Sequence, residues 1–183
     1  VASGHRRIAF AAGPSHDAQA RERRGGYLEA MARRLPAVEP WVVAGEGDRT
    51  AGIRAALTLL GAPDLPDAVF AANDQTALGC LHAFARSGVP VPDAVSVVGF
   101  DDGPEAALAQ PGLTTMRVDG VELGRRAEHR LLALVAGGGA PSMLVTEALV
   151  PTLSGRDRVA PRAPAARGAS SQGRVAGRER EAG

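Results

Sequence analysis

The side chains best suited to bind a ligand follow short apolar runs of the chain. The candidates are Asp17, Gln19, Arg23, Asn73 and Asp74. The first three come after the apolar run 8–12, and the last two come after the run 67–72. A guanidinium is a planar group with several donors, and a carboxylate can accept hydrogen bonds from two hydroxyl groups. These residue types therefore suit a small ligand that carries several hydroxyl groups.

Each candidate also has a structural explanation that needs no ligand. The run from Arg21 to Arg24 could be the solvated Arg–Glu face of a helix. Asn73 and Asp74 could cap a helix, since Asn and Asp are preferred there and favour the positive end of the helix dipole. The two roles can coexist, with Asn73 capping the helix and Asp74 reaching the ligand.

Two further features could support other chemistry. Asp101 and Asp102 follow the apolar run 95–100, where paired carboxylates could hold Mg²⁺ or form a turn. The loop 45–52 is rich in glycine, but its G-x-G-x-x-x-x-G spacing differs from the dinucleotide fingerprint. No other acidic residue completes an evident metal site, and we expect neither a metal nor a cofactor.

Short apolar runs alternate with segments of helical periodicity, which is typical of an α/β fold. We expect strands over residues 8–12, 41–44, 67–72, 95–100, 114–118 and 143–150, and helices over 18–35, 50–60, 74–87 and 120–136. Apolar strands without alternation indicate a parallel sheet covered on both faces. In such sheets ligands bind beyond the carboxyl ends of the strands, which is where the candidate residues lie. The glycine pair at 25 and 26 inside a helix suggests a close backbone approach.

Composition limits the remaining possibilities. The chain has 183 residues, and all 21 of its basic residues are arginine. Residues 162–183 lack hydrophobic periodicity and carry a net charge of +3, and we expect them to be a disordered tail. The remaining residues, 1–161, carry a net charge of −2 and therefore offer no basic field for a polyanion. Cys80 is the only cysteine, so no internal disulfide can form. Without a signal peptide or a long apolar stretch, we expect a cytoplasmic protein.

Several stretches taken together resemble the LacI/GalR family of bacterial transcription regulators. The most specific are N-D-Q-T-A-L-G at 73–79 and V-S-V-V-G-F-D-D at 95–102. They are joined in order by A-R-E-R-R-G-G-Y at 20–27, P-G-L-T-T-M at 111–116 and L-S-G-R at 153–156. The resemblance covers residues 4–158.

This resemblance implies an effector-binding domain of the periplasmic-binding-protein-like type, with a sugar-like molecule in a cleft between two lobes. By motif position, Arg23 would grip the effector and Asp74 would be the carboxylate that grips its hydroxyl groups. Asp17 and Gln19 fall where specificity contacts vary, and Gly47 falls where several members place an aromatic ring. The resemblance also implies a homodimer and no enzymatic activity. Operator DNA would be bound only through a helix-turn-helix that this chain does not contain.

The same comparison divides the chain unevenly between the lobes. Residues 8–117 would form one parallel-sheet lobe, residues 119–137 would return to the other, incomplete lobe, and residues 143–158 would come back. The helix within 120–136 would then have no sheet to cover and would expose an apolar patch. The third helix, with Leu78, Leu81 and Phe84, could face a second copy or form half of the core.

Two alternatives remain at this stage. A sugar-binding receptor of an importer shares the fold and would be secreted. An α/β enzyme would use the Asp101–Asp102 pair with Mg²⁺.

Overall fold

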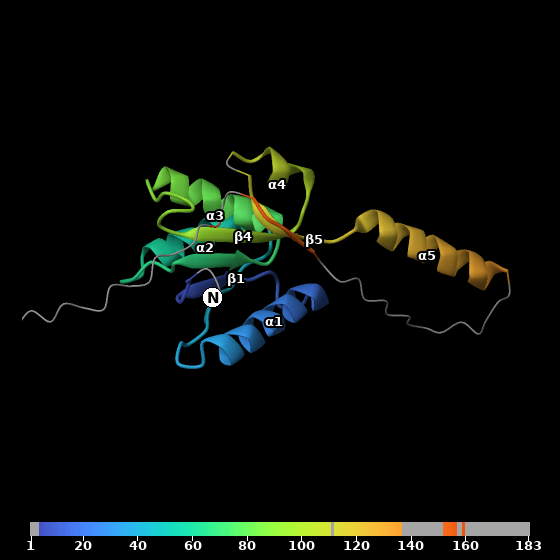
Figure 1. Ribbon diagram of the computed structural model, residues 1–183, viewed down its shortest axis with the longest axis horizontal. Helices are drawn as coiled ribbons and strands as arrows, with labels where there is room; N and C mark the ends of the chain where they lie inside the picture. The colour runs from blue at the N-terminus through green and yellow to red at the C-terminus, as the bar shows by residue number, and fades with distance from the viewer. Residues whose placement is uncertain (1–3, 111, 137–151, 157–158, 160–183) are drawn as a thin grey trace, which may run out of the picture.

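A six-stranded sheet organises the computed structural model, which describes residues 4–110, 112–136, 152–156 and 159 (Figure 1). The strands are β1 (Ile8–Ala11), β2 (Trp41–Val43), β3 (Ala68–Ala71), β4 (Ser96–Asp101), β5 (Thr114–Arg117) and β6 (Thr152–Ser154). The helices are α1 (Ala18–Arg34), α2 (Arg49–Leu60), α3 (Asp74–Arg86), α4 (Pro104–Leu108) and α5 (Gly120–Val135). The strand order is β2-β1-β3-β4-β5-β6, and β1 to β5 are parallel, which confirms the predicted α/β class.

Helices cover the two faces of the sheet unequally. One face packs against α2 and α3 around Leu59 and Phe84, both fully buried. The other face carries α1, whose Tyr27 stacks on Phe10 of β1 with ring centroids 5.2 Å apart. Leu81 is also buried and Leu78 is partly buried, so α3 contributes to the core, while the face toward a second copy stays a prediction. The low aromatic content is matched by a core built mainly of alanine, valine and leucine.

Helices α2 and α3 approach each other closely at two glycines. A Cβ atom on Gly79 would lie 2.1 Å from the carbonyl oxygen of Arg49, and one on Gly52 would lie 2.1 Å from that of Thr76. The prediction of a close approach at Gly25 and Gly26 is wrong. No described atom beyond the α1 backbone lies within 4 Å of a Cβ built at either position.

Two short elements differ from the sequence prediction. α4 is a five-residue helix with proline in its first turn, too short to show a hydrophobic period. β6 pairs antiparallel with the edge strand β5, so the sheet is not wholly parallel. The expected strand over 143–150 and the expected tail over 162–183 lie outside the described residues.

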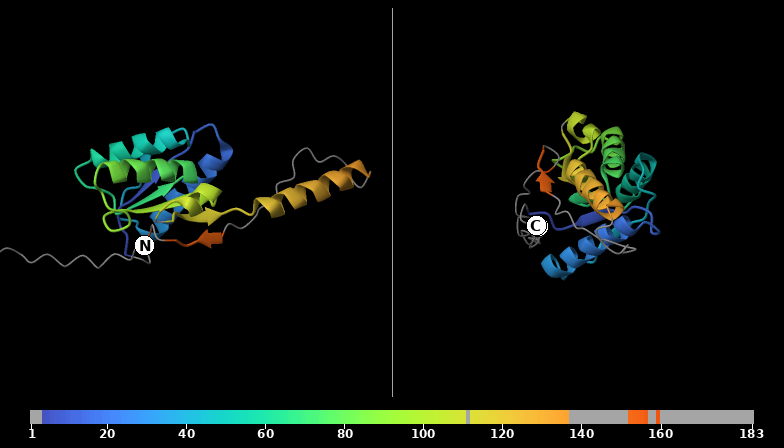
Figure 2. Two further views of the ribbon diagram at one scale, coloured as in Figure 1. Left: turned by 90° about the horizontal axis from the view of Figure 1, so that it is seen from above. Right: turned by 90° about the vertical axis from the view of Figure 1, so that its right-hand side faces the viewer.

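α5 extends away from the sheet and from the other helices (Figures 1 and 2). None of its described residues is buried, although its sequence is amphipathic. The exposed apolar side chains are Val121, Leu123, Leu131, Leu132, Leu134 and Val135. The expected exposed patch is therefore present. Among the described residues, no helix combines the length and the apolar character that crossing a membrane requires.

Candidate functional site

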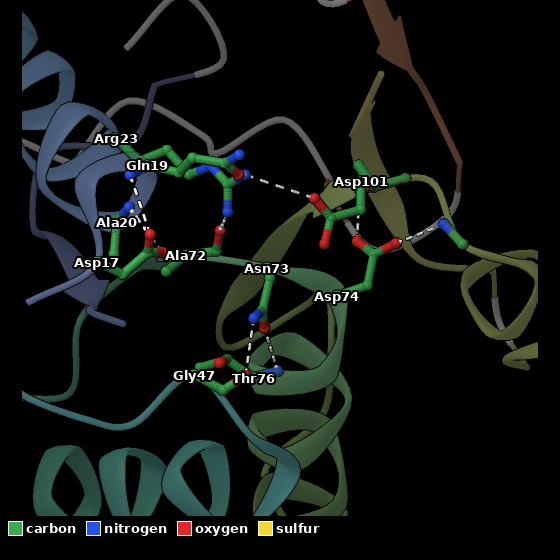
Figure 3. A network of polar contacts seen from close by, with 12 residues as sticks. Asp17, Gln19, Ala20, Arg23, Gly47, Ala72, Asn73, Asp74, Thr76 and Asp101 are labelled. Carbon is green, nitrogen blue, oxygen red and sulfur yellow. Dashed lines mark hydrogen bonds and ion pairs between the residues drawn. The ribbon is translucent and has the colours of Figure 1, made fainter. Parts of the chain in front are cut away.

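The carboxyl ends of β1, β3 and β4 meet at one edge of the sheet, and the predicted residues gather there (Figure 3). Asp17 is the N-cap of α1, and its carboxylate accepts hydrogen bonds from the backbone N–H groups of Gln19 and Ala20, each at 3.2 Å. This cap fixes the start of the helix about one and a half turns before Arg23. Asp17 thus has a structural role at this edge.

Arg23 is held in place by four neighbours. Its Nη1 donates to the carbonyl of Ala72 at 2.9 Å, and its Nη2 donates to Oε1 of Gln19 at 3.0 Å. The guanidinium lies 4.1 Å from the centre of the Phe100 ring, and Nη2 is 3.7 Å from Oδ1 of Asp101. These contacts fix the group before any ligand arrives, and 17% of the side chain remains exposed.

Asn73 joins two loops at the same edge. Its Oδ1 accepts from the backbone N–H of Thr76 at 2.8 Å, which caps α3, and its Nδ2 donates to the carbonyl of Gly47 at 2.7 Å. Gly47 has a φ of +78°, a conformation that L side chains rarely adopt. The loop after β2 therefore presents backbone to the edge, and no aromatic ring stands at position 47.

Asp74 lies inside the protein, with only 4% of its surface exposed. Its Oδ2 accepts from the backbone N–H of Gly103 at 2.8 Å, and its Oδ1 accepts from the Thr115 hydroxyl at 2.5 Å. Burial raises the pKa of Asp74, and these hydrogen bonds partly offset the rise. The carboxylate holds the loop before α4 against β5. Both carboxylate oxygens of Asp74 thus already accept hydrogen bonds from within the protein, and its role in gripping a ligand stays a prediction.

Asp101 is a second carboxylate at this edge of the sheet, and it lies near Arg23. It ends β4, half of its side chain is exposed, and its carboxylate faces Arg23 (Figure 3). Burial raises the pKa of Asp101; the charge of Arg23 lowers it, and that of Asp74 raises it further. Because Asp101 follows an apolar strand, its position in the sequence also predicts that it lies at this edge of the sheet. The sequence predicts a metal pair or a turn at Asp101 and Asp102. In the structure, each of these carboxylates lies near an arginine, Asp101 near Arg23 and Asp102 near Arg156.

A cavity of about 360 Å³ lies beside the ends of β1 and β2. Its lining includes Gly13, Arg21, Arg24 and Glu46. The Nη1 of Arg21 donates to the carbonyls of Ser15 and His16, at 3.2 and 2.8 Å. This volume falls in the range of small-molecule sites. Neither Arg23 nor Asp101 is among the residues that line this cavity.

Residues 1–157 match the family described as "Periplasmic binding protein-like domain". The chain therefore belongs to this family, in the group that forms the core of LacI/GalR-type regulators. Among its relatives are the HTH-type transcriptional regulator GalS of Salmonella typhimurium and the lactose operon repressor of Escherichia coli. GalS is 36% identical over 159 residues, which are 86% of this chain and 46% of GalS. The lactose operon repressor is 37% identical over 139 residues, which are 75% of this chain and 38% of that protein.

Solved structures give the same result. The LacI transcriptional regulator from a Rhodococcus species superposes with a TM-score of 0.80 at 36% identity, covering 87% of this chain and 58% of that one. The lac repressor dimer bound to operator and the anti-inducer ONPF gives a TM-score of 0.78 at 32% identity, covering 87% and 54%. The chain thus spans about half the length of the relatives it matches. Those relatives are transcriptional regulators, which does not favour the enzyme alternative.

Proposed function

We propose that this chain is the effector-sensing part of a LacI/GalR-type regulator and that it binds a small sugar-like molecule at the edge of its sheet. The observation that carries the proposal is the pair formed by Arg23 and Asp101, which come from different elements and face each other at 3.7 Å. A guanidinium offers donors to ring and hydroxyl oxygens, and a carboxylate accepts from hydroxyl groups. A polyol presents both kinds of partner within a few ångströms.

The site is prepared for hydrogen bonding rather than for stacking. Gln19 and the Ala72 carbonyl hold the guanidinium of Arg23, so little side-chain freedom is lost when a ligand binds. Gly47 offers no ring on which a sugar or a base could stack. We infer that selectivity comes from the number and placement of ligand hydroxyl groups, with Gln19 acting on the ligand through Arg23.

Regulation would require parts of a longer protein. In this proposal, a second lobe packs on the apolar face of α5, and the effector bridges the two lobes. A ligand shifts the balance between open and closed forms only by binding one of them more tightly. The intact regulator would act as a homodimer on operator DNA in the cytoplasm, through a DNA-binding segment outside this chain. The relatives GalS and the lactose operon repressor support this assignment over an importer receptor.

A thermal-shift screen tests the proposal. The full chain is heated with D-galactose, D-glucose, D-ribose, lactose and o-nitrophenyl-β-D-galactoside, each at millimolar concentration. We expect at least one sugar to raise the melting temperature of the wild type, and Arg23→Gln to abolish the rise. A shift of the same size in Arg23→Gln would place sugar binding elsewhere.

A further inference from the structure

The backbone that carries Asp101 is held in an unusual conformation. Asp101 has a φ of 118° and Asp102 has a φ of 60°, both in the region that L residues rarely adopt. Aspartate tolerates the second value better than most residues do, but the first is costly for any side chain. Such a conformation persists when neighbouring contacts hold it in place. The contacts of Asp102 therefore bear on where the carboxylate of Asp101 points.

Asp102 is bound by two side chains from the end of the described chain. The Ser154 hydroxyl donates to its Oδ2 at 3.0 Å, and Nη2 of Arg156 forms an ion pair with its Oδ1 at 2.8 Å. Only 11% of the Asp102 side chain is exposed. Burial alone would raise the pKa of Asp102, but Arg156 and Ser154 outweigh it and hold that pKa below its ordinary value. The carboxylate is thus strongly tied to these two residues.

Arg156 is itself anchored to the start of β5. Its Nη1 donates to the carbonyl of Leu113 at 2.9 Å, and its backbone N–H donates to the Thr114 hydroxyl at 3.0 Å. Its side chain also covers Gly112, where an added Cβ would lie 2.8 Å from Cδ of Arg156. Arg156 therefore connects three places: strand β5, the segment that follows β6, and the turn at Asp102.

We propose that Asp102 is a positioning residue which, held by Ser154 and Arg156, fixes Asp101 opposite Arg23 and so couples strand β6 to the ligand site. The proposal rests on the proposed function for its biological meaning, but its geometry can be tested without a ligand. β6 follows the segment that leaves the sheet through α5. A displacement of β6 would loosen Asp102 and turn the Asp101 carboxylate away from the guanidinium.

The test measures how strongly Arg23 influences Asp101. The carboxyl carbon of Asp101 is titrated by ¹³C NMR in the full chain, with and without Arg23→Gln. In the wild type, the loss of the guanidinium should raise the pKa of Asp101, because the charge of Arg23 lowers it. In an Arg156→Gln background, we expect Arg23→Gln to produce less than half of that rise, because Asp101 no longer faces position 23.

Two further backgrounds separate positioning from general stability. Arg125→Gln removes an exposed arginine that pairs with Glu122 on α5. In this background, Arg23→Gln should still raise the pKa of Asp101 by the full wild-type amount. Arg156→Lys keeps a cation beside Asp102, so in this background Arg23→Gln should again produce most of the rise in the pKa of Asp101. If Arg156→Gln does not fold, the titration is repeated in Ser154→Ala, which removes one contact and should also reduce the rise. An equal rise in the wild type and in the Arg156→Gln or Ser154→Ala background overturns the proposal, whether or not any sugar binds.

Discussion

The contact between α2 and α3 positions Asn73 and Asp74, and a single methyl group should disrupt it. In Gly79→Ala, the new Cβ would lie 2.1 Å from the carbonyl oxygen of Arg49 and 2.9 Å from the backbone nitrogen of Ile53. The first distance is more than 1 Å shorter than a close C···O contact of about 3.3–3.6 Å. Both obstacles are backbone atoms of α2, so no side chain can turn aside, and the helices must separate.

The expected cost can be estimated from overpacking in other cores. Extra methylene groups in a well-packed core typically cost about 1–3 kcal/mol, and a backbone clash of this size belongs at the upper end. For a domain of this size, about 1 kcal/mol corresponds to about 2–4 °C, so Gly79→Ala should lower the melting temperature by about 6–12 °C. Thermal unfolding followed by circular dichroism measures this change.

Gly25→Ala provides a matched control within the same chain. Gly25 is exposed in the middle of α1, and no described atom outside the α1 backbone lies within 4 Å of an added Cβ. Alanine is favoured over glycine inside a helix by about 0.5–1 kcal/mol, so this variant should melt slightly higher than the wild type. The reasoning fails if Gly79→Ala is as stable as the wild type, or if the two substitutions shift the melting temperature equally.

Three other predictions concern the site and α5. Asp74→Ala should destabilise the fold by about 2–4 kcal/mol in urea melts, because the Gly103 N–H and the Thr115 hydroxyl lose a charged acceptor; an unchanged midpoint would refute its internal role. The raised pKa of Asp74 means that the folded state binds the Asp74 proton more tightly than the unfolded state does. The free energy of unfolding should therefore fall as the pH rises from the ordinary aspartate pKa through the raised pKa. Urea melts at successive pH values should show this fall in the wild type and lose the Asp74 contribution to it in Asp74→Asn. The wild type should bind the dye ANS, and Leu131→Gln with Leu132→Gln should reduce its fluorescence; equal fluorescence would place dye binding elsewhere.

Most of the fold could be predicted because its strands and helices follow strong local rules. Buried strands such as 67–72 are apolar on both sides, and helices such as 74–87 start at an Asn or Asp cap and end near glycine. β6 and α4 could not be predicted in this way. Three residues forming an antiparallel edge and five residues forming a helix leave no period to detect, and both depend on contacts with β5 and the turn after β4.

The site could be predicted only to the level of the strand ends. Asn73 and Asp74 are adjacent in the sequence, but the turn of α3 sends Asn73 to the Gly47 loop and Asp74 into the interior. The carboxylate that faces Arg23 is set by the positive φ of Asp101, and no local sequence pattern predicts that backbone conformation. The strand-end rule also predicts Asp17 and Gln19 at this edge, but their contacts with the α1 backbone and with Arg23 depend on the side-chain geometry of the folded helix.

Isothermal titration of the full chain with the sugar that gives the largest thermal shift tests the central claim most directly. We expect Arg23→Gln and Asp101→Asn each to weaken binding about tenfold to a hundredfold, the equivalent of about 1.5–3 kcal/mol for a charged hydrogen bond. Arg33→Gln, which removes an exposed arginine paired with Glu29 on the same helix, should bind like the wild type. Wild-type affinity in both Arg23→Gln and Asp101→Asn would show that this pair of charges does not hold the ligand.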